Sequence, residues 1–343
     1  MLDKGIIEKV ANEPNEIISN IFTKPKKHGT HRVILNLREF NKSISYYHFK
    51  MDSLPTILKL IDKNCFMACI DLKDAYYSIP IRQRDRKYLK FQWNDTLYQY
   101  TCLPNGLSSG PRKFTKILKP PLPFLHTKGH IVSGHLEDFY LQGKTPEECS
   151  QNVTDTVTLF TRLGMLVHPD KSIFNPSQNL LILGFEINSV SMIVRLTEEK
   201  AQALKLDCEK FVQKSYKMLP IREVAQIVGK LISSFPGVLY GPLYYRSLEK
   251  DKTAALAKHK GNFDAKMRVS TQGIAELTWW STHVLDACKP ISHSEPCMVL
   301  TTDASKKGWG AECHNISTGG LWSNSEASEH INYLELLPTF FWP

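Results

Sequence analysis

The sequence predicts an α+β protein built from two or three structural units. Its 343 residues exceed what one compact hydrophobic core usually fills. Hydrophobic residues make up 42% and charged residues 22% of the chain, as in an average soluble globular protein, which excludes a disordered, collagenous or coiled-coil chain. Short apolar runs bounded by turn residues, typical of strands, occur alongside long amphipathic stretches, typical of helices.

The first predicted elements alternate between helix and strand. Aliphatic residues at helical spacing between positions 6 and 10 predict a helix over the first ~20 residues. A Pro-Lys-Lys-His-Gly-Thr turn between two apolar runs predicts a β-hairpin over residues 21–37. A helix is expected over residues 53–61 after a serine cap. A buried strand should follow over residues 66–70, with Asp71 at its carboxyl end.

The middle of the chain carries clear start and stop signals. Residues 110–128 begin with Gly-Pro and suit a helix, which is expected to end at a cluster of three prolines after position 119. Two short strands about a polar centre are expected over residues 131–141. An amphipathic helix over residues 145–163 and a hairpin over residues 180–196 follow.

The last part of the chain is predicted to be mostly helical. Residues 197–249 have a helical pattern that breaks at Pro220 and at the Phe-Pro-Gly turn of residues 235–237. Residues 250–261, which are rich in lysine and alanine, are the best linker candidate. Residues 299–341 begin a new unit with a strand, a glycine turn, more strand and a helix.

The chain is basic, which favours a polyanionic partner. It has 43 lysines and arginines against 34 aspartates and glutamates, a formal net charge of +9. Each cation that neutralises a phosphate releases condensed counterions, so a basic protein gains affinity for nucleic acid. Two clusters concentrate the charge: Lys24, Lys26, Lys27 and Arg32, and then Arg82, Arg84, Arg86, Lys87 and Lys90. A solvated face is an equally acceptable interpretation of the second cluster.

Three observations favour an intracellular protein of the cytoplasm or nucleus. No apolar run approaches the ~20 residues that a membrane helix needs, so no membrane partner is expected. The sequence does not begin with the basic and then apolar segment of a secretory signal. Its eight cysteines lack paired metal-type spacing and are interpreted as scattered reduced thiols.

Acidic residues beside two apolar runs are the candidate catalytic groups. Asp71 directly follows the apolar run 66–70, and a carboxylate in that setting is costly unless it is paired or binds a cation. Glu137 and Asp138 lie in what is predicted to be a tight hairpin. Carboxylates at two such strand ends can bind two Mg²⁺ ions for phosphoryl transfer. Asp71 as a helix cap, and Glu137 and Asp138 as turn acids, remain open alternatives.

Six segments, in order along the chain, resemble the reverse transcriptases of retroelements. Residues 26–41 resemble the fingers hairpin, and residues 71–80 resemble the first catalytic motif. Residues 103–111 resemble the Leu-Pro-x-Gly-Leu motif, and residues 135–138 stand where the family has its Tyr-x-Asp-Asp box. Residues 183–185 match the later Leu-Gly-Phe hairpin, and residues 302–336 resemble the opening of a ribonuclease H domain. Residues 227–245 are most similar to the tyrosine-recombinase (DIRS-like) retrotransposons, with Gypsy-type elements next.

The resemblance implies a right-hand polymerase with a truncated ribonuclease H-like α/β segment at the C-terminal end. Fingers and palm would span residues 1–195, thumb-like helices 196–250, a connection or linker 251–297, and the partial ribonuclease H-like domain 298–343. The implied activity is RNA-directed DNA synthesis: transfer of deoxynucleotides to a primer 3′-hydroxyl on an RNA or DNA template, with two Mg²⁺ ions. The oligomeric state is not implied.

Individual residues receive roles from the resemblance alone. Asp71, Glu137 and Asp138 would be the catalytic metal ligands. The incoming deoxynucleoside triphosphate would contact Lys26, Lys27, Arg32, Asp74, Ala75, Tyr76 and Asn105, with Tyr76 excluding a 2′-hydroxyl. Asp303 and Glu335 match two ribonuclease H carboxylates. Plainer interpretations are a solvated hairpin for the two lysines, a core aromatic for Tyr76, and turn positions for Asn105 and Asp303.

The sequence also departs from the family pattern. Glu137 stands where the double-aspartate box has its first aspartate, His135 replaces the tyrosine of that box, and His28 replaces a fingers aspartate. Glutamate moves the carboxylate outward by one methylene, and a misplacement of ~1 Å can cost ~10²-fold in rate, so an impaired polymerase is expected. About 45 residues of ribonuclease H cannot bury a full core, so no hydrolysis is expected from them. A catalytically dead nucleic-acid-binding protein of retroelement origin is the alternative.

Overall fold

The computed structural model describes residues 1–25, 31–214, 217–292, 298–314 and 316–341. It divides into two compact units, residues 1–291 and residues 292–343. No helix in the described part of the chain is both long enough and apolar enough to cross a bilayer. The seven cysteines among the described residues are free thiols, as predicted.

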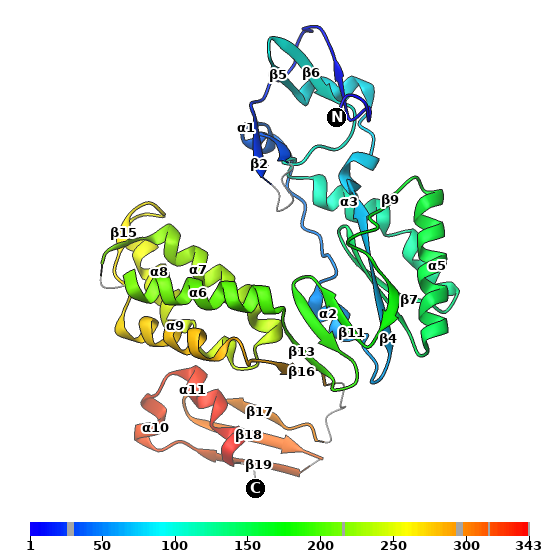
Figure 1. Ribbon diagram of the computed structural model, residues 1–343. Helices are drawn as coiled ribbons and strands as arrows, with labels where there is room; N and C mark the ends of the chain where they lie inside the picture. Colours follow the sequence, from blue (N-terminus) through cyan, green and yellow to red (C-terminus); the bar gives the residue numbers. More distant parts are fainter. Residues whose placement is uncertain (26–30, 215–216, 293–297, 315, 342–343) are drawn as a thin grey trace. The chain divides into compact units, whose positions relative to one another are not determined.

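An antiparallel sheet of the first unit carries the candidate catalytic residues, and two of its strands, β4 and β7, are labelled in Figure 1. Its strands, in spatial order, are β10 (Ile173–Ser177), β4 (Phe66–Lys73), β8 (Asp138–Gly143) and β7 (Ile131–His135), with β9 (Leu166–Val167) pairing the end of β4. One face is covered by α3 (Gly110–Leu118), α4 (Pro121–Thr127) and α5 (Pro146–Arg162).

Strand β4 is buried on both faces, which explains its unbroken apolar run. Ala68, Ile70 and Leu72 belong to the cluster beneath α5, whereas Met67 and Cys69 belong to the cluster on the opposite face. Successive strand residues alternate between faces, so Asp71 lies on the face turned away from α5. Asp71 falls inside β4, which continues to Lys73, and not at the end of a strand as predicted.

A second group of strands forms around the N-terminal residues. The three-stranded sheet is β1 (Ile7–Lys9), β6 (Thr96–Tyr100) and β5 (Lys90–Trp93), and the hairpin of β2 (Ile21–Pro25) and β3 (His31–Leu35) leads into α1 (Arg38–Lys42). The 3₁₀ helices η1 (Ala75–Ser78) and η2 (Gln83–Tyr88) connect this part to β4 and β5. The hairpin confirms the prediction for residues 21–37.

The remaining part of the first unit is a small sheet followed by helices. The sheet has β11 (Asn179–Ile182), β12 (Phe185–Asn188), β13 (Ile193–Leu196) and β16 (Lys289–Pro290), and α2 (Leu54–Leu58) belongs to the same core. The helices are α6 (Glu198–Lys214), α7 (Ile221–Ser234), α8 (Arg246–Lys258) and α9 (Thr271–His283), with η3 (Phe235–Gly237), η4 (Gly241–Leu243) and the two-strand pair β14 (Leu219–Pro220) and β15 (Lys266–Met267) between them. Leu248 on α8 and Trp280 on α9 are fully buried.

The second unit has the order predicted for residues 299–341. Its sheet is β17 (Thr301–Ala304), β18 (Gly308–Cys313) and β19 (Ile316–Leu321), followed by α10 (Asn324–Ser328), α11 (Ile331–Leu336) and α12 (Pro338–Phe341). Trp309, Trp322 and Phe341 pack as an aromatic cluster with ring centroids 5.3–6.4 Å apart.

Three further predictions of local structure are wrong. The first residues form strand β1 and not a helix, because residues 7–9 pair in register with residues 98–100 of β6. The linker predicted at residues 250–261 lies mostly within α8, since lysine and alanine are also strong helix formers. The prolines after position 119 end one helix but also begin α4, because proline suits the first turn of a helix.

Candidate active site

Two of the three predicted catalytic carboxylates lie directly opposite each other. Asp71 on β4 and Asp138 on β8 are cross-strand partners in the central sheet. Because paired residues share a face, both side chains lie on the side away from α5. The backbone carbonyl of Glu137 accepts a hydrogen bond from the Leu72 amide at 2.9 Å, which ties the hairpin turn to β4. Residues far apart in the sequence therefore meet at one end of the sheet.

Glu137 lies in the tight turn that joins β7 and β8. His135 pairs with Asp138, so only Leu136 and Glu137 form the loop. Leu136 has a φ of +54°, a left-handed conformation that costs a residue with a side chain free energy. Two-residue hairpins require this positive φ, because the matching turns fit the right-handed twist of the strands. A Ser133 hydroxyl and the His135 ring, which contact the side chain and carbonyl of Asp52, hold β7 in place.

The carboxylates are close enough to perturb one another. Asp71 is 8% exposed, and its Oδ1 is buried without a hydrogen-bond partner among the described residues. Burial, followed by the charges of Asp71 and Glu137, raises the pKa of Asp138 to about 6. Lys171 brings a compensating charge, with its Nζ 3.6 Å from Asp71 Oδ2. The site therefore concentrates negative charge that lacks full compensation within the protein.

A cavity of about 690 Å³ opens beside these groups. Its lining includes Asp71 and Glu137 together with four residues predicted to bind the nucleotide, namely Asp74, Ala75, Tyr76 and Asn105. Cationic side chains also line it: Lys4, Lys73 and Lys171. Asp138 is not among the lining residues. The structure thus brings six of the predicted site residues to one cavity.

The chain turns sharply after β4, and residues 71–77 line this cavity. Asp74 has a φ of +52° and precedes the 3₁₀ helix η1, so Asp71 does not cap a helix. Tyr76 is half-buried against Phe114, with ring centroids 5.1 Å apart, and burial followed by the charge of Glu137 raises the pKa of its hydroxyl to about 12. It is both a packed aromatic and a residue of the cavity lining. Asn105 donates a hydrogen bond to the Tyr77 hydroxyl at 3.0 Å.

The loop around Asn105 is held by an asparagine from α1. Asn41 donates from Nδ2 to the Gly106 carbonyl at 2.9 Å and accepts from the Ser108 amide at 2.9 Å. Gly106 has a φ of +110°, and a Cβ there would lie 2.5 Å from the carbonyl oxygen of Leu35. Only glycine fits this close approach between the loop and β3. Residues 41 and 106 belong to two of the resembling segments, and the structure shows that they are in contact.

Several predicted residues lie outside what the structure describes, or apart from this site. Lys26, Lys27 and His28 fall outside the described residues, and for Arg32 only the backbone, in β3, is described. Asp303 lies on β17 and Glu335 on α11, both exposed and both in the second unit. Their role stays a prediction.

One predicted basic cluster turns out to be partly internal. Lys90 is fully buried and pairs with Glu13 and Glu16, and Arg86 pairs with Glu8 at 3.0 Å. Because these two cations are neutralised by carboxylates of the protein itself, Lys90 and Arg86 neither form a solvated face nor are available to contact nucleic acid. Lys4 and Lys171 are cavity residues that sequence analysis missed, because an isolated lysine carries no local signal.

The donor set suits a hard divalent cation such as Mg²⁺. Carboxylate oxygens are its preferred protein ligands, and the unpartnered Asp71 Oδ1 is a buried acceptor available to it. Among the described residues, no three His, Cys, Asp or Glu side chains are already arranged as a ligand set. Asp71, Glu137 and Asp138 are the residues that would hold such an ion.

Comparison with known proteins agrees with this arrangement. Residues 24–187 match the sequence model of the family described as reverse transcriptase (RNA-dependent DNA polymerase). This match covers just under half of the chain. The Tf2-3 and Tf2-7 transposon polyproteins of Schizosaccharomyces pombe are each 24% identical to it over 164 residues, which are 48% of this chain and 12% of the polyprotein. The matched part of the chain thus spans about an eighth of the length of these relatives.

Solved structures show the same fold. The foamy viral protease-reverse transcriptase in complex with dsDNA has a TM-score of 0.69 and 19% identity, covering 99% of this chain and 68% of that chain. The same viral protein in complex with an RNA/DNA hybrid has a TM-score of 0.65 and 16% identity, covering 99% and 44%. The chain therefore has the right-hand polymerase fold of these structures, as predicted.

Proposed function

We propose that this protein is an RNA-directed DNA polymerase of a retrotransposon, which works inside the cell and extends a primer on an RNA or DNA template. The observation that carries the proposal is the pairing of Asp71 with Asp138 across β4 and β8, with Glu137 in the adjoining turn. The reverse transcriptase match over residues 24–187 supports it, as does the net charge of +9. The related foamy viral protein is known in complex with dsDNA and with an RNA/DNA hybrid, the two kinds of duplex that such synthesis requires.

The proposed reaction joins a primer 3′-hydroxyl to the α-phosphate of a deoxynucleoside triphosphate and releases pyrophosphate. Asp71, Glu137 and Asp138 would hold two Mg²⁺ ions. When bound, these ions would activate the hydroxyl and neutralise charge on the phosphates. The buried position of Asp71 keeps its carboxylate in a fixed place, which is what positioning catalysis requires.

The neighbouring residues would bind and select the nucleotide. The turn at Asp74 and Ala75 lies at the cavity, where backbone groups can approach the phosphates. The Tyr76 ring, held against Phe114, would lie under the sugar and exclude a 2′-hydroxyl by its bulk. Asn105, anchored on the Tyr77 hydroxyl, would contact the nucleotide from the side. Lys26 or Lys27 and Arg32 would complete the triphosphate site from the hairpin of β2 and β3.

We further propose that Glu137, in place of an aspartate, lowers the catalytic rate of the polymerase. Glu137 lies in a turn that is constrained by the Leu136 backbone conformation and by the hydrogen bond from the Leu72 amide. The backbone therefore cannot easily shift to compensate for the extra methylene, which moves the Glu137 carboxylate outward. A displacement of ~1 Å at a reacting centre can cost ~10²-fold in rate. Restoring the shorter carboxylate should therefore raise activity.

Primer extension with the purified chain, Mg²⁺ and deoxynucleotides tests the proposal on an RNA and a DNA template. We expect weak extension by the wild type, a gain of ~10-fold or more for Glu137→Asp, and none for Asp71→Ala. Asp286→Asn, an exposed aspartate in the segment after α9, is the control and should behave as the wild type. Absence of extension by both the wild type and Glu137→Asp would contradict the polymerase proposal.

The alternative function is a catalytically dead protein that still binds nucleic acid. Glu137 is the observation that favours it, because this change falls on a predicted metal ligand. Under this alternative the chain binds primer-template with a strong salt dependence, and neither Asp71→Ala nor Glu137→Asp alters incorporation. The same primer-extension assay, run beside template binding at two salt concentrations, separates the two functions.

A further inference from the structure

The first residues of the chain form a strap across the three-stranded sheet. We define the N-terminal strap as residues 1–16. Strand β1 within it pairs with β6, and the carbonyls of Gly5 and Ile6 accept hydrogen bonds from the Thr101 hydroxyl and amide at 2.5 and 3.1 Å. The turn before β1 is closed by the hydrogen bond from the Ile6 amide to the Met1 carbonyl. The strap is thus bound by backbone contacts up to the edge of the cavity.

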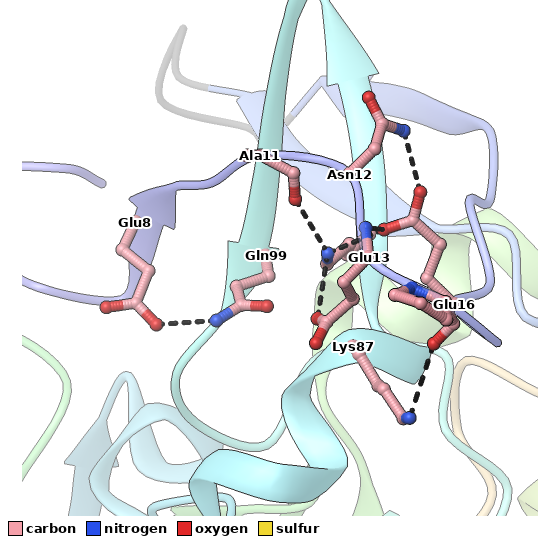
Figure 2. Close-up of polar contacts among 9 residues, drawn as sticks. Glu8, Ala11, Asn12, Glu13, Glu16, Lys87 and Gln99 are labelled. Carbon is pink, nitrogen blue, oxygen red and sulfur yellow. Dashed lines mark hydrogen bonds and ion pairs between the residues drawn. The ribbon is translucent and has the colours of Figure 1, made fainter.

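The buried side chain of Lys90 anchors the other end of the N-terminal strap, and Figure 2 shows its three partners Ala11, Glu13 and Glu16. The Lys90 side chain is 1% exposed, and its Nζ lies 3.1 Å from the Ala11 carbonyl, 2.9 Å from Glu13 and 2.6 Å from Glu16. Hydrogen bonds from Lys90 and then from Asn12 lower the pKa of Glu16 to about 2. Three acceptors surround one ammonium group, so this end of the strap is held firmly on β5.

The anchored strap places a cation in the candidate active site. Lys4 lines the same cavity as Asp71 and Glu137, and its Nζ lies 3.0 Å from Asp74 Oδ2. The Lys4 side chain is 61% exposed and the Asp74 side chain 31%, so this is an accessible ion pair that a stronger anion can replace. Lys9, on the same strap, is not among the residues that line the cavity.

We propose that Lys4 binds the triphosphate of the incoming deoxynucleotide by exchanging the Asp74 carboxylate for a phosphate oxygen. This inference rests on the proposed polymerase function and adds a cation that lies outside the segments resembling the family. A triphosphate carries more charge than one carboxylate and offers several acceptors, so it competes well for an exposed ammonium group. Because the strap is already ordered by β6 and Lys90, little backbone entropy is lost when Lys4 engages the ligand.

Steady-state kinetics of single-nucleotide incorporation test the proposal with four proteins: wild type, Lys4→Ala, Lys4→Arg and the control Lys9→Ala. For Lys4→Ala we expect a roughly 5- to 20-fold increase in KM for the deoxynucleotide, with kcat changed less than about 2-fold. Lys4→Arg should recover most of the loss, and Lys9→Ala should match the wild type. The Kd for primer-template should be equal in all four proteins, and thermal unfolding should show that all four are folded.

Two outcomes would overturn the proposal. If Lys4→Ala lowers kcat or weakens primer-template binding while KM for the nucleotide is unchanged, Lys4 contacts nucleic acid or acts only on the structure. If Lys4→Ala and Lys9→Ala have the same KM, the lysine has no role in nucleotide binding.

A nucleotide-binding measurement tests the role of Lys4 independently of the proposed polymerase activity. Fluorescence titration with N-methylanthraniloyl-dATP in Ca²⁺ reports nucleotide binding without requiring chemistry. If the wild type incorporates nothing but binds this probe ~5-fold or more tightly than Lys4→Ala, the polymerase proposal fails and the role of Lys4 stands. If the wild type incorporates nucleotide and Lys4→Ala binds the probe equally well, only the role of Lys4 fails. No binding of the probe by the wild type contradicts both.

Discussion

Replacing Asp138 by asparagine should stabilise the metal-free protein, although Asp138 is a proposed catalytic residue. Burial and the charges of Asp71 and Glu137 raise its pKa to about 6, from an ordinary value of 3.8. The folded protein therefore binds the Asp138 proton more tightly than the unfolded chain does. Above pH 6 the group ionises in both states, and ionisation costs the folded state more.

The size of this effect follows from the pKa. One pKa unit corresponds to ~1.36 kcal/mol, so a rise from 3.8 to about 6 sets an upper bound of ~3 kcal/mol on the destabilisation at neutral pH. The side chain is partly open to solvent, and screening reduces this to roughly 1–2 kcal/mol. For a chain of 343 residues, with an unfolding entropy of ~2.1 cal/mol/K per residue, that corresponds to an increase of about 1–3 °C in Tm. Asparagine has nearly the same shape but cannot ionise.

Thermal unfolding in EDTA is the assay, with the wild type, Asp138→Asn and the control Asp286→Asn compared between pH 4 and pH 7.5. The stabilisation should be full at pH 7.5 and should decline as the pH falls through about 6 toward 3.8, where the wild-type group is also neutral. Asp286→Asn should show no such trend. A variant with no gain at pH 7.5, or with the same gain at pH 4, would refute the charge argument. Mg²⁺ should stabilise the wild type more than Asp138→Asn.

Two further predictions concern residues that shape and support the cavity. Gly106→Ala should cost about 2–4 kcal/mol and raise KM for the nucleotide, because its Cβ would lie 2.5 Å from the Leu35 carbonyl oxygen. Gly129→Ala, at a φ of +84° with open space around it, should cost only about 1 kcal/mol, and equal losses in urea unfolding would contradict the steric argument. Lys90→Met should lower the free energy of unfolding by about 2–3 kcal/mol, since it leaves Glu13 and Glu16 without their cation. Lys63→Met, at an exposed position, is its control, and an equal effect of both changes on urea unfolding would show that the Lys90 ion pairs contribute little.

Elements with a strong local signal were predictable. The hairpins over residues 21–37 and 131–141 and the helix over 145–163 match β2 and β3, β7 and β8, and α5. Each combines a clear hydrophobic period with turn or cap residues, and the Thr145 hydroxyl does cap α5. The first residues were predicted wrongly because their apolar pattern is short. Their pairing with β6, some ninety residues along the chain, decides their conformation.

The sequence by itself determined which chemical groups the candidate site would contain. Asp71, Glu137 and Asp138 attracted attention by their settings beside apolar runs, and the resemblance to reverse transcriptases gave them a catalytic role, which stays a prediction. The family match over residues 24–187 agrees with the reverse transcriptase interpretation. Only the tertiary structure decided that Asp71 faces Asp138, that Lys4 reaches Asp74, and that Lys90 is an internal anchor and not a surface charge. The reason is physical: the charge state and partners of a side chain depend on burial and on distances of a few ångströms, which long-range contacts set.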